Sequence, residues 1–183
     1  MTVKAFPPTV SPRALVRGVP AWGWQVSGAF LIYLVVSYFI LAASPDATVK
    51  VRFSIEPLAA AALAVQVHVV AAIGTFFIGL GLLLAPKGFR WHKAFGWIWV
   101  GAMAVTAISS FFITGIMGDT YSPIHALSAW TLIGLPFGIF AIRRRNVRKH
   151  RQTMTGMFVG GMAIAGLFTF LPGRLMWHLF FSI

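Results

Sequence analysis

The sequence predicts an all-α integral membrane protein with about five transmembrane helices. Of its 183 residues, 58% are hydrophobic and only 10% are charged, whereas a soluble domain carries roughly 25% charged residues. A soluble chain of this size cannot bury so much apolar surface. The apolar residues also gather in uncharged runs of about 20 residues, which is the length of helix that crosses the hydrocarbon core of a bilayer.

Five apolar runs are the predicted spans, with Lys93 at the start of the third as their only Lys, Arg, Asp or Glu. Together they form a membrane domain over residues 21–173. The second run is longer than a span requires, so we expect its membrane segment in the later part. The first run is too long for the apolar region of a signal peptide, which makes it an anchor. A lead-in over residues 1–20 precedes the domain, and a tail over residues 174–183 follows it on the outer surface. In chain order the runs are Trp22–Ser44, Leu58–Ala85, Trp91–Met117, Ser122–Ile142 and Thr153–Leu171.

The basic residues gather on one side of the predicted bundle. Loops rich in Lys and Arg stay in the cytoplasm, so we expect a cytoplasmic N-terminus and a periplasmic C-terminus in a bacterial inner membrane. The cytoplasmic set is Lys4, Arg13, Arg17, Lys87, Arg90, Lys93, Arg143, Arg144, Arg145, Arg148, Lys149 and Arg151. The outer side has only Lys50, Arg52 and Arg174, together with all three acids, Asp46, Glu56 and Asp119.

Several classes of function are excluded by composition and charge pattern. A net charge of +12 is also typical of nucleic-acid binding. Because this charge lies in short loops beside the spans, we expect contact with anionic lipid headgroups and no nucleic-acid partner. No cysteine is present, which excludes disulfides, thiolate metal sites and Fe–S clusters. No carboxylate falls inside a predicted span, which argues against pumps and antiporters that use intramembrane acids.

The chain repeats itself after the first span. His68 and His92 are 24 residues apart, and His125 and His150 are 25 residues apart. The segments that follow the second histidine of each pair are also alike, with a slip of one residue. These segments are Val100-Gly-Ala-Met-Ala-Val105 and Val159-Gly-Gly-Met-Ala-Ile164. We interpret helices 2–3 and helices 4–5 as two copies of one hairpin, in parallel orientation about an axis along the membrane normal.

The repeat assigns the four histidines to two layers of the bundle. His68 and His125 take equivalent positions towards the outer face, and His92 and His150 take equivalent positions at the cytoplasmic starts of helices 3 and 5. A pseudo-two-fold axis brings each pair face to face. Two facing imidazoles are what six-coordinate haem b requires. We therefore predict two haem b groups, with one pair of histidines as the iron ligands of each.

Other roles for these histidines stay open at this point. His68 and His125 lie in apolar stretches, where an interhelical hydrogen bond or a contact to a quinone or another metal would also account for an ionisable side chain. His92 and His150 lie in basic helix starts, where a histidine can simply meet lipid headgroups.

Two resemblances follow from these motifs. Arg90-Trp-His92-Lys-Ala-Phe-Gly96 and Arg148-Lys-His150-Arg151 resemble the helix starts of a family of small bacterial predicted membrane proteins of uncharacterised function. The pairing of helix 2 with helix 4, and of helix 3 with helix 5, is similar to cytochrome b561-type electron carriers. That resemblance implies that each histidine pair ligates one haem b.

The leading hypothesis for function is a b-type haem protein, a membrane oxidoreductase or electron carrier that transfers electrons within or across the bilayer, with quinol as a candidate donor. The alternative is a non-catalytic accessory subunit of a larger respiratory or photosynthetic membrane complex. A small, basic, glycine-rich bundle with an aromatic tail suits this second role. Small-molecule transport is a third hypothesis, which only the internal repeat supports.

Overall fold

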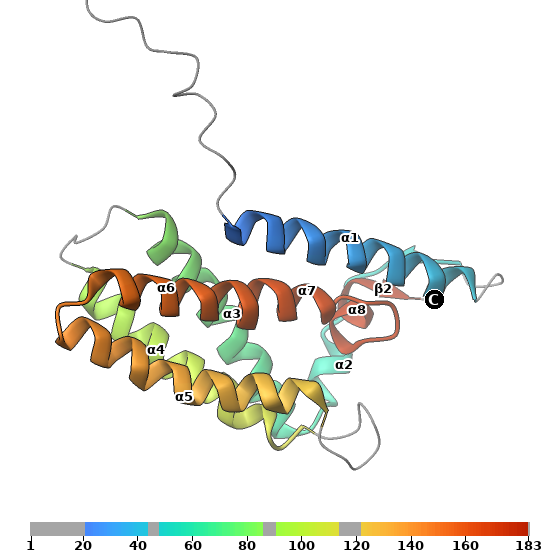
Figure 1. The fold of residues 1–183 in the computed structure, drawn as a ribbon. Coiled ribbons are helices and arrows are strands. Elements are labelled where there is room, and N and C mark those ends of the chain that lie inside the picture. The colour runs from blue at the N-terminus through green and yellow to red at the C-terminus, as the bar shows by residue number, and fades with distance from the viewer. Residues whose placement is uncertain (1–20, 44–47, 86–90, 114–121, 183) are drawn as a thin grey trace, which may run out of the picture.

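Long helices make up most of the molecule, and successive long helices run in opposite directions (Figure 1). The structure is a computed structural model, and it describes residues 21–43, 48–85, 91–113 and 122–182. Its long elements are α1 (Ala21–Ala42), α3 (Leu63–Leu84), α4 (His92–Ser110), α5 (Pro123–Arg143) and a continuous run of α6 (Val147–Met157), the π-helix η2 (Phe158–Ile164) and α7 (Ala165–Phe168). Its short elements are β1 (Lys50–Val51), α2 (Glu56–Ala59), α8 (Leu175–Phe180) and β2 (Phe181–Ser182).

Three of the predicted spans form helices that are long and apolar enough to cross a membrane. These are Trp22–Ala42, Leu63–Leu84 and Ile124–Arg143. A helix of 22 residues such as α3 is ~33 Å long at about 1.5 Å per residue, which matches a hydrocarbon core of about 30 Å. The second predicted run contains a break, because α2 ends at Ala59 and α3 begins at Leu63. Its membrane segment is therefore the later part, as the sequence predicts.

The other two predicted runs also form helices, with different bounds. The helix of the third run ends at Ser110, while residues 114–117 of that run lie outside the described residues, as do the lead-in over 1–20 and residue 44. The fifth run begins earlier than Thr153, because α6 starts at Val147. The reason is a cap: the Asn146 side chain accepts a hydrogen bond from the Lys149 backbone N–H at 3.0 Å. Such a bond satisfies one of the free donors at a helix start.

Four helical segments pack as a closed ring, and α1 lies outside it (Figure 1). Around the ring, α3 packs on α4, α4 on α5, α5 on α6, and η2 returns to α3. The outer helix α1 packs against η2 and α7, and Tyr33 donates a hydrogen bond to the Phe170 carbonyl at 3.3 Å. Many large apolar side chains of α1 are exposed, which is the surface that a helix presents to lipid.

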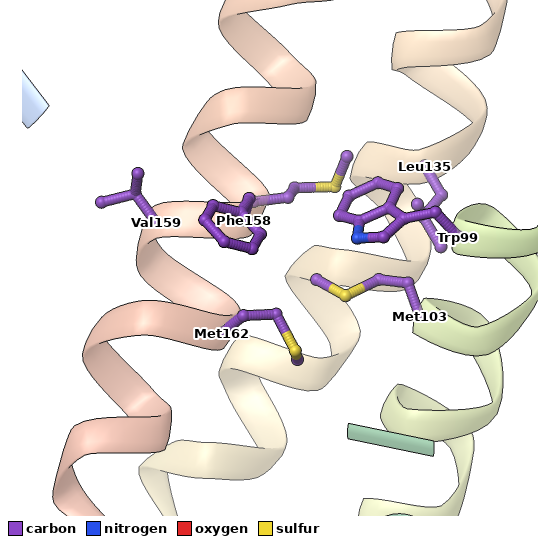
Figure 2. Close-up of a cluster of buried hydrophobic side chains, with 7 residues drawn as sticks. Trp99, Met103, Leu135, Phe158, Val159 and Met162 are labelled. Carbon is purple, nitrogen blue, oxygen red and sulfur yellow. The ribbon is translucent and has the colours of Figure 1, made fainter. Parts of the chain in front are cut away.

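A hydrophobic cluster fills one half of the ring, towards the end where α4 and α6 begin. Figure 2 shows Trp99 and Met103 from α4 meeting Phe158 and Met162 from η2. Met103 is the most buried of them, with 1% of its surface exposed. The full cluster is Trp99, Met103, Leu135, Met157, Phe158, Val159 and Met162. Its side chains hold the four segments together by dispersion contacts, which drive helix association where lipid replaces water.

The described part of the tail, residues 174–182, folds back onto the segment between α1 and α3. Strand β2 pairs with β1 in antiparallel fashion, with Lys50 opposite Ser182 and Val51 opposite Phe181. The Ser54 backbone N–H continues the pairing by donating to the Leu179 carbonyl at 2.9 Å. With Trp177 and Leu179 buried, the described part of the tail is packed into the fold rather than separate from it.

Gly79 of α3 faces the cluster at a point where the chain has no room for a side chain. A Cβ atom at Gly79 would lie 2.6 Å from both Trp99 Nε1 and Phe158 Cδ2. We expect Gly79→Ala to destabilise the protein by about 1–3 kcal/mol, the usual cost of overpacking a core, because two rigid rings would have to move. Unfolding by SDS in mixed micelles measures this. The matched control is Gly81→Ala on the same helix, where a Cβ would meet nothing within 4 Å. Equal stability of the two variants would contradict this account of the core.

Candidate functional site

A cavity of about 470 Å³ lies inside the four-helix ring, next to the hydrophobic cluster. Side chains of α3, α4, α5, η2 and α7 line it, and Met103 and Met162 belong to both the cluster and the cavity wall. Most of the wall is apolar, and its histidine, serine and threonine residues are His68, Thr106, Ser128, Thr131 and Thr169. Ligand sites in proteins have this character, with volumes of roughly 300–1,000 Å³, apolar walls and a few polar groups.

His68 reaches this cavity from α3, and one of its ring nitrogens is held by the neighbouring helix. His68 Nδ1 lies 2.9 Å from the Thr106 carbonyl oxygen and 3.2 Å from Ser109 Oγ. Because a carbonyl can only accept, Nδ1 carries the ring proton, and the lone pair is on Nε2. A histidine that ligates a metal usually donates its other ring N–H to a carbonyl or carboxylate in this way. The same tautomer can also accept a hydrogen bond from a bound hydroxyl group.

His125 has a different role in its helix. It is buried, with 4% of its surface exposed, and it occupies the third position of α5, where Nδ1 accepts a hydrogen bond from the Ser122 backbone N–H at 3.0 Å. This reciprocal pairing of the residue before a helix with its third residue is a capping box. An Nδ1 that accepts a hydrogen bond is unprotonated, so the ring proton of the neutral side chain is on Nε2, which is the opposite tautomer to that of His68.

The structure brings the predicted histidine pairs to opposite ends of the ring. His68 and His125 lie near the starts of α3 and α5, although His68 lines the cavity and His125 does not. His92 begins α4, and His150 lies in α6 with Nδ1 at 2.9 Å from the Gly138 carbonyl of α5. Within the described ranges, no group of three or more His, Asp or Glu side chains is close enough to hold a metal ion. Haem ligation by these pairs stays a prediction.

Buried hydroxyl groups lie on the helices that form the cavity, and Thr106, Ser128 and Thr131 among them line it. The sequence analysis does not single them out. On α4 these are Thr106, Ser109 and Ser110, and the Ser110 and Ser128 hydroxyls lie 2.5 Å apart, joining α4 to α5. Most of them also bond a carbonyl of their own helix; Thr75 and Thr131, for example, donate to the carbonyls of Ala71 and Leu127.

In the sequence, the signal for these hydroxyl groups is a spacing of three residues. Ser122, His125, Ser128 and Thr131 follow one another at this interval, so each lies beside the next on the surface of α5, in a row that winds around the helix by about 60° per step. In an otherwise apolar run, such a stripe predicts a polar face turned towards the bundle interior.

The glycines at positions 134 and 138 allow α5 and α6 to approach closely. A Cβ at Gly134 would lie 2.9 Å from Met157 Sδ, and one at Gly138 would collide with the Met154 side chain. Close helix packing, rather than space for a cofactor, is therefore what this small-residue pair supplies here.

Comparison with known proteins gives one match. A family model described as Predicted membrane protein (DUF2306) matches residues 65–181, which contain every residue that lines the cavity. None of the curated proteins and none of the solved structures matches the chain. The predicted membership of an uncharacterised membrane-protein family is confirmed, and the similarity to cytochrome b561-type carriers stays a prediction.

The capping role of His125 can be tested by exchange of the side chain. His125→Gln should retain most of the stability, because glutamine is one of the residues that cap from this position. His125→Ala should lower the free energy of unfolding by about 0.5–2 kcal/mol, the range for a lost cap. SDS titration in mixed micelles separates the two variants. If glutamine is no better than alanine, the side chain does not act as a cap.

Proposed function

The chain belongs to the DUF2306 family of predicted membrane proteins, and from this premise we propose that it binds haem b inside the four-helix ring and transfers electrons within the bilayer. The main support for the proposal is the position of His68. Its ring lines the cavity, and its Nδ1 donates a hydrogen bond to the Thr106 carbonyl. In this tautomer Nε2 is the ring nitrogen that would hold a haem iron. When bound, haem supplies an iron that takes up and releases one electron.

The cavity wall fits a flat, largely apolar group. Gly161, Ala163, Ala165 and Gly166 present small side chains or none on one side, and aromatic rings such as Phe76 lie on the other helices of the ring. Cofactors in helical bundles are held in this way, between side chains that face inward from several helices. In this protein, the residues that bind the group would be His68 and this wall, and the surrounding helices would keep water out.

The proposal is for one haem, whereas the sequence predicts two. The half of the ring nearer His92 and His150 is filled by the hydrophobic cluster, so a second macrocycle there would have to displace Trp99 and Phe158. At the cavity, His125 is the predicted second ligand. It would have to turn from its cap at Ser122 to reach an iron, and without that turn the iron would have His68 alone.

A quinone is the second candidate for the same cavity. The wall combines one histidine that can accept a hydrogen bond with the hydroxyls of Ser128 and Thr131. Quinol oxidation needs a group that accepts the phenolic proton, and His68 Nε2 is available for it. Haem and quinone would occupy the same space, so only one of them can be bound at a time. The visible spectrum and the organic extract of the purified protein show which one it is.

The reduced-minus-oxidised visible spectrum of the purified protein tests the haem proposal. We expect haem b absorbance in the natural protein and its loss in His68→Ala, because the iron would lose its held ligand. His178→Ala is the matched control, since His178 is exposed on α8 and lies outside the cavity lining.

Three other outcomes have definite meanings. Retention of haem in His68→Ala would contradict the ligand assignment. A colourless protein whose organic extract contains quinone, lost in His68→Ala, would favour the quinone candidate. A colourless protein that copurifies with a larger respiratory or photosynthetic complex, and holds no quinone, would favour the accessory-subunit alternative. Exposed apolar side chains beside β1, such as Phe53 and Ile55, would then be the surface for such a complex.

The proposal includes five membrane crossings in a bacterial inner membrane, with a cytoplasmic N-terminus and a periplasmic C-terminus. It is supported by the charges at the two ends of the described bundle (Figure 1). The end where α5 meets α6 carries Arg143, Arg144, Arg145, Arg148, Lys149 and Arg151. The opposite end has Lys50, Arg52, Glu56 and Arg174. Basic loops remain in the cytoplasm during insertion.

Reporter fusions test this topology. A fusion after Arg145 should report a cytoplasmic location, with active green fluorescent protein and inactive alkaline phosphatase. A fusion at the C-terminus should give the reverse, because a single helical run separates the two sites. Both fusions reporting the same side would mean that the run from α6 to α7 does not cross the membrane.

A further inference from the structure

The fifth helical run changes its hydrogen-bonding pattern where it borders the cavity. Residues Phe158–Ile164 form the π-helix η2 between the α-helical segments α6 and α7. A π-helical turn bonds residue i to i+5 and so contains one more residue than an α-helical turn. Such turns are rare, and they occur frequently at functional sites. Gly161, Met162 and Ala163 of η2 all line the cavity.

The same segment holds one residue more than its counterpart in α4. Eleven residue steps lead from His92 to Met103, and twelve lead from His150 to Met162. In an α-helix each step turns the chain by about 100°. Met103 therefore returns to within about 20° of the face of His92, whereas Met162 in a regular α-helix would lie about 120° from the face of His150. Both methionines are nevertheless buried in the same cluster (Figure 2).

We infer that η2 takes up this extra residue, and that the resulting turn holds the cavity open. The π turn restores the register of the helix, so that Met162 points into the cluster as Met103 does. It also widens the wall: three consecutive residues, 161–163, face the cavity from η2, whereas α4 contributes Met103, Thr106 and Ala107 at ordinary helical spacing.

Gly161 is the residue of η2 that stands against α4. A Cβ there would lie 3.1 Å from Met103 Cε and 3.8 Å from Thr131 Oγ1, so the absence of a side chain leaves the space in front of these two residues unfilled. The wall on the other side of the turn is also made of small residues, Ala163, Ala165 and Gly166. The π turn therefore specifies the width of the site, and with it the bulk of ligand that can enter. This last step rests on the proposed function.

Single-residue deletions test the inference. Deleting Gly161 should convert η2 to α-helix while the residues before and after it keep their faces, so the protein should fold with nearly the natural SDS-unfolding midpoint. The matched control deletes another glycine, Gly101, from the regular helix α4, where a Cβ would meet nothing within 4 Å. That deletion turns Met103 and Thr106 by about 100° away from the core, so it should lose the folded state. Equal damage from the two deletions would overturn the inference.

Labelling of a thiol in the cavity wall tests the width of the cavity, and it needs no natural ligand. The chain contains no cysteine, so Thr131→Cys supplies a single thiol in the cavity wall. In a His68→Ala background, where the proposed ligand is not held, a small methanethiosulfonate reagent should modify this thiol. The modification should be lost when Gly161 is also deleted, and lost as well in Ala163→Leu, which fills the cavity without a change of register. Continued labelling in both variants would contradict the role of η2 in opening the site.

These results separate the inference from the proposed function. If the natural protein holds neither haem nor quinone, the proposed function fails, yet the deletions and the thiol labelling still report whether η2 sets the register and the width. If the natural protein binds haem, and the Gly161 deletion folds and binds it equally well, the inference fails alone.

Discussion

The hydrocarbon core of a membrane offers no water to a polar group, so the buried polar side chains of this bundle bond to the protein itself. Among the described residues, Ser37 Oγ, Trp99 Nε1 and Trp177 Nε1 are buried exceptions without a hydrogen-bond partner. The hydroxyls of Thr75, Thr106, Ser128 and Thr131 donate to carbonyls of their own helices. Other bonds run between helices, such as those from His68 to Thr106, from Ser110 to Ser128 and from His150 to Gly138. The packing of the ring and the tautomers of its histidines both follow from this requirement. Where the interior carries no polar group, methionine and aromatic side chains take over the contact between the same helices.

Much of the fold could be predicted from the sequence, because apolar runs and basic loops are direct consequences of the bilayer. Helix α5 begins and ends within one residue of the predicted run, and α3 forms the later part of its run, as expected. The early start of α6 was missed, since the apolar run begins after a basic turn that the Asn146 cap nucleates. The π-helix was missed for another reason. No residue type marks it, and its only sequence signal is one extra residue between His150 and Met162. The fold of the tail depends on pairing with a segment far away in the chain, which local patterns do not report.

For the candidate site, the sequence identified the residue types but not their partners. The histidines were singled out because an ionisable side chain in an apolar run needs a reason to be there. Their different surroundings come from helix position: His125 is three residues past Ser122 and closes a cap, whereas His68 is further along its helix and faces α4. The serine and threonine residues of α5 also recur at a regular spacing in the sequence. A hydroxyl group indicates a functional site less specifically than a histidine does.

The pairing of β1 with β2 has a consequence for the order of events during biosynthesis. The partner of Lys50 and Val51 is synthesised only after every long helix of the bundle has been made. Until then, the backbone N–H groups of Arg52 and Ser54 lack the Phe180 and Leu179 carbonyls that accept from them. Domains fold from their N-terminal parts as the chain emerges, but this segment has to wait. The β1–β2 pairing can therefore form only after the last helix has been synthesised, and it joins the segment between α1 and α3 to the C-terminal tail.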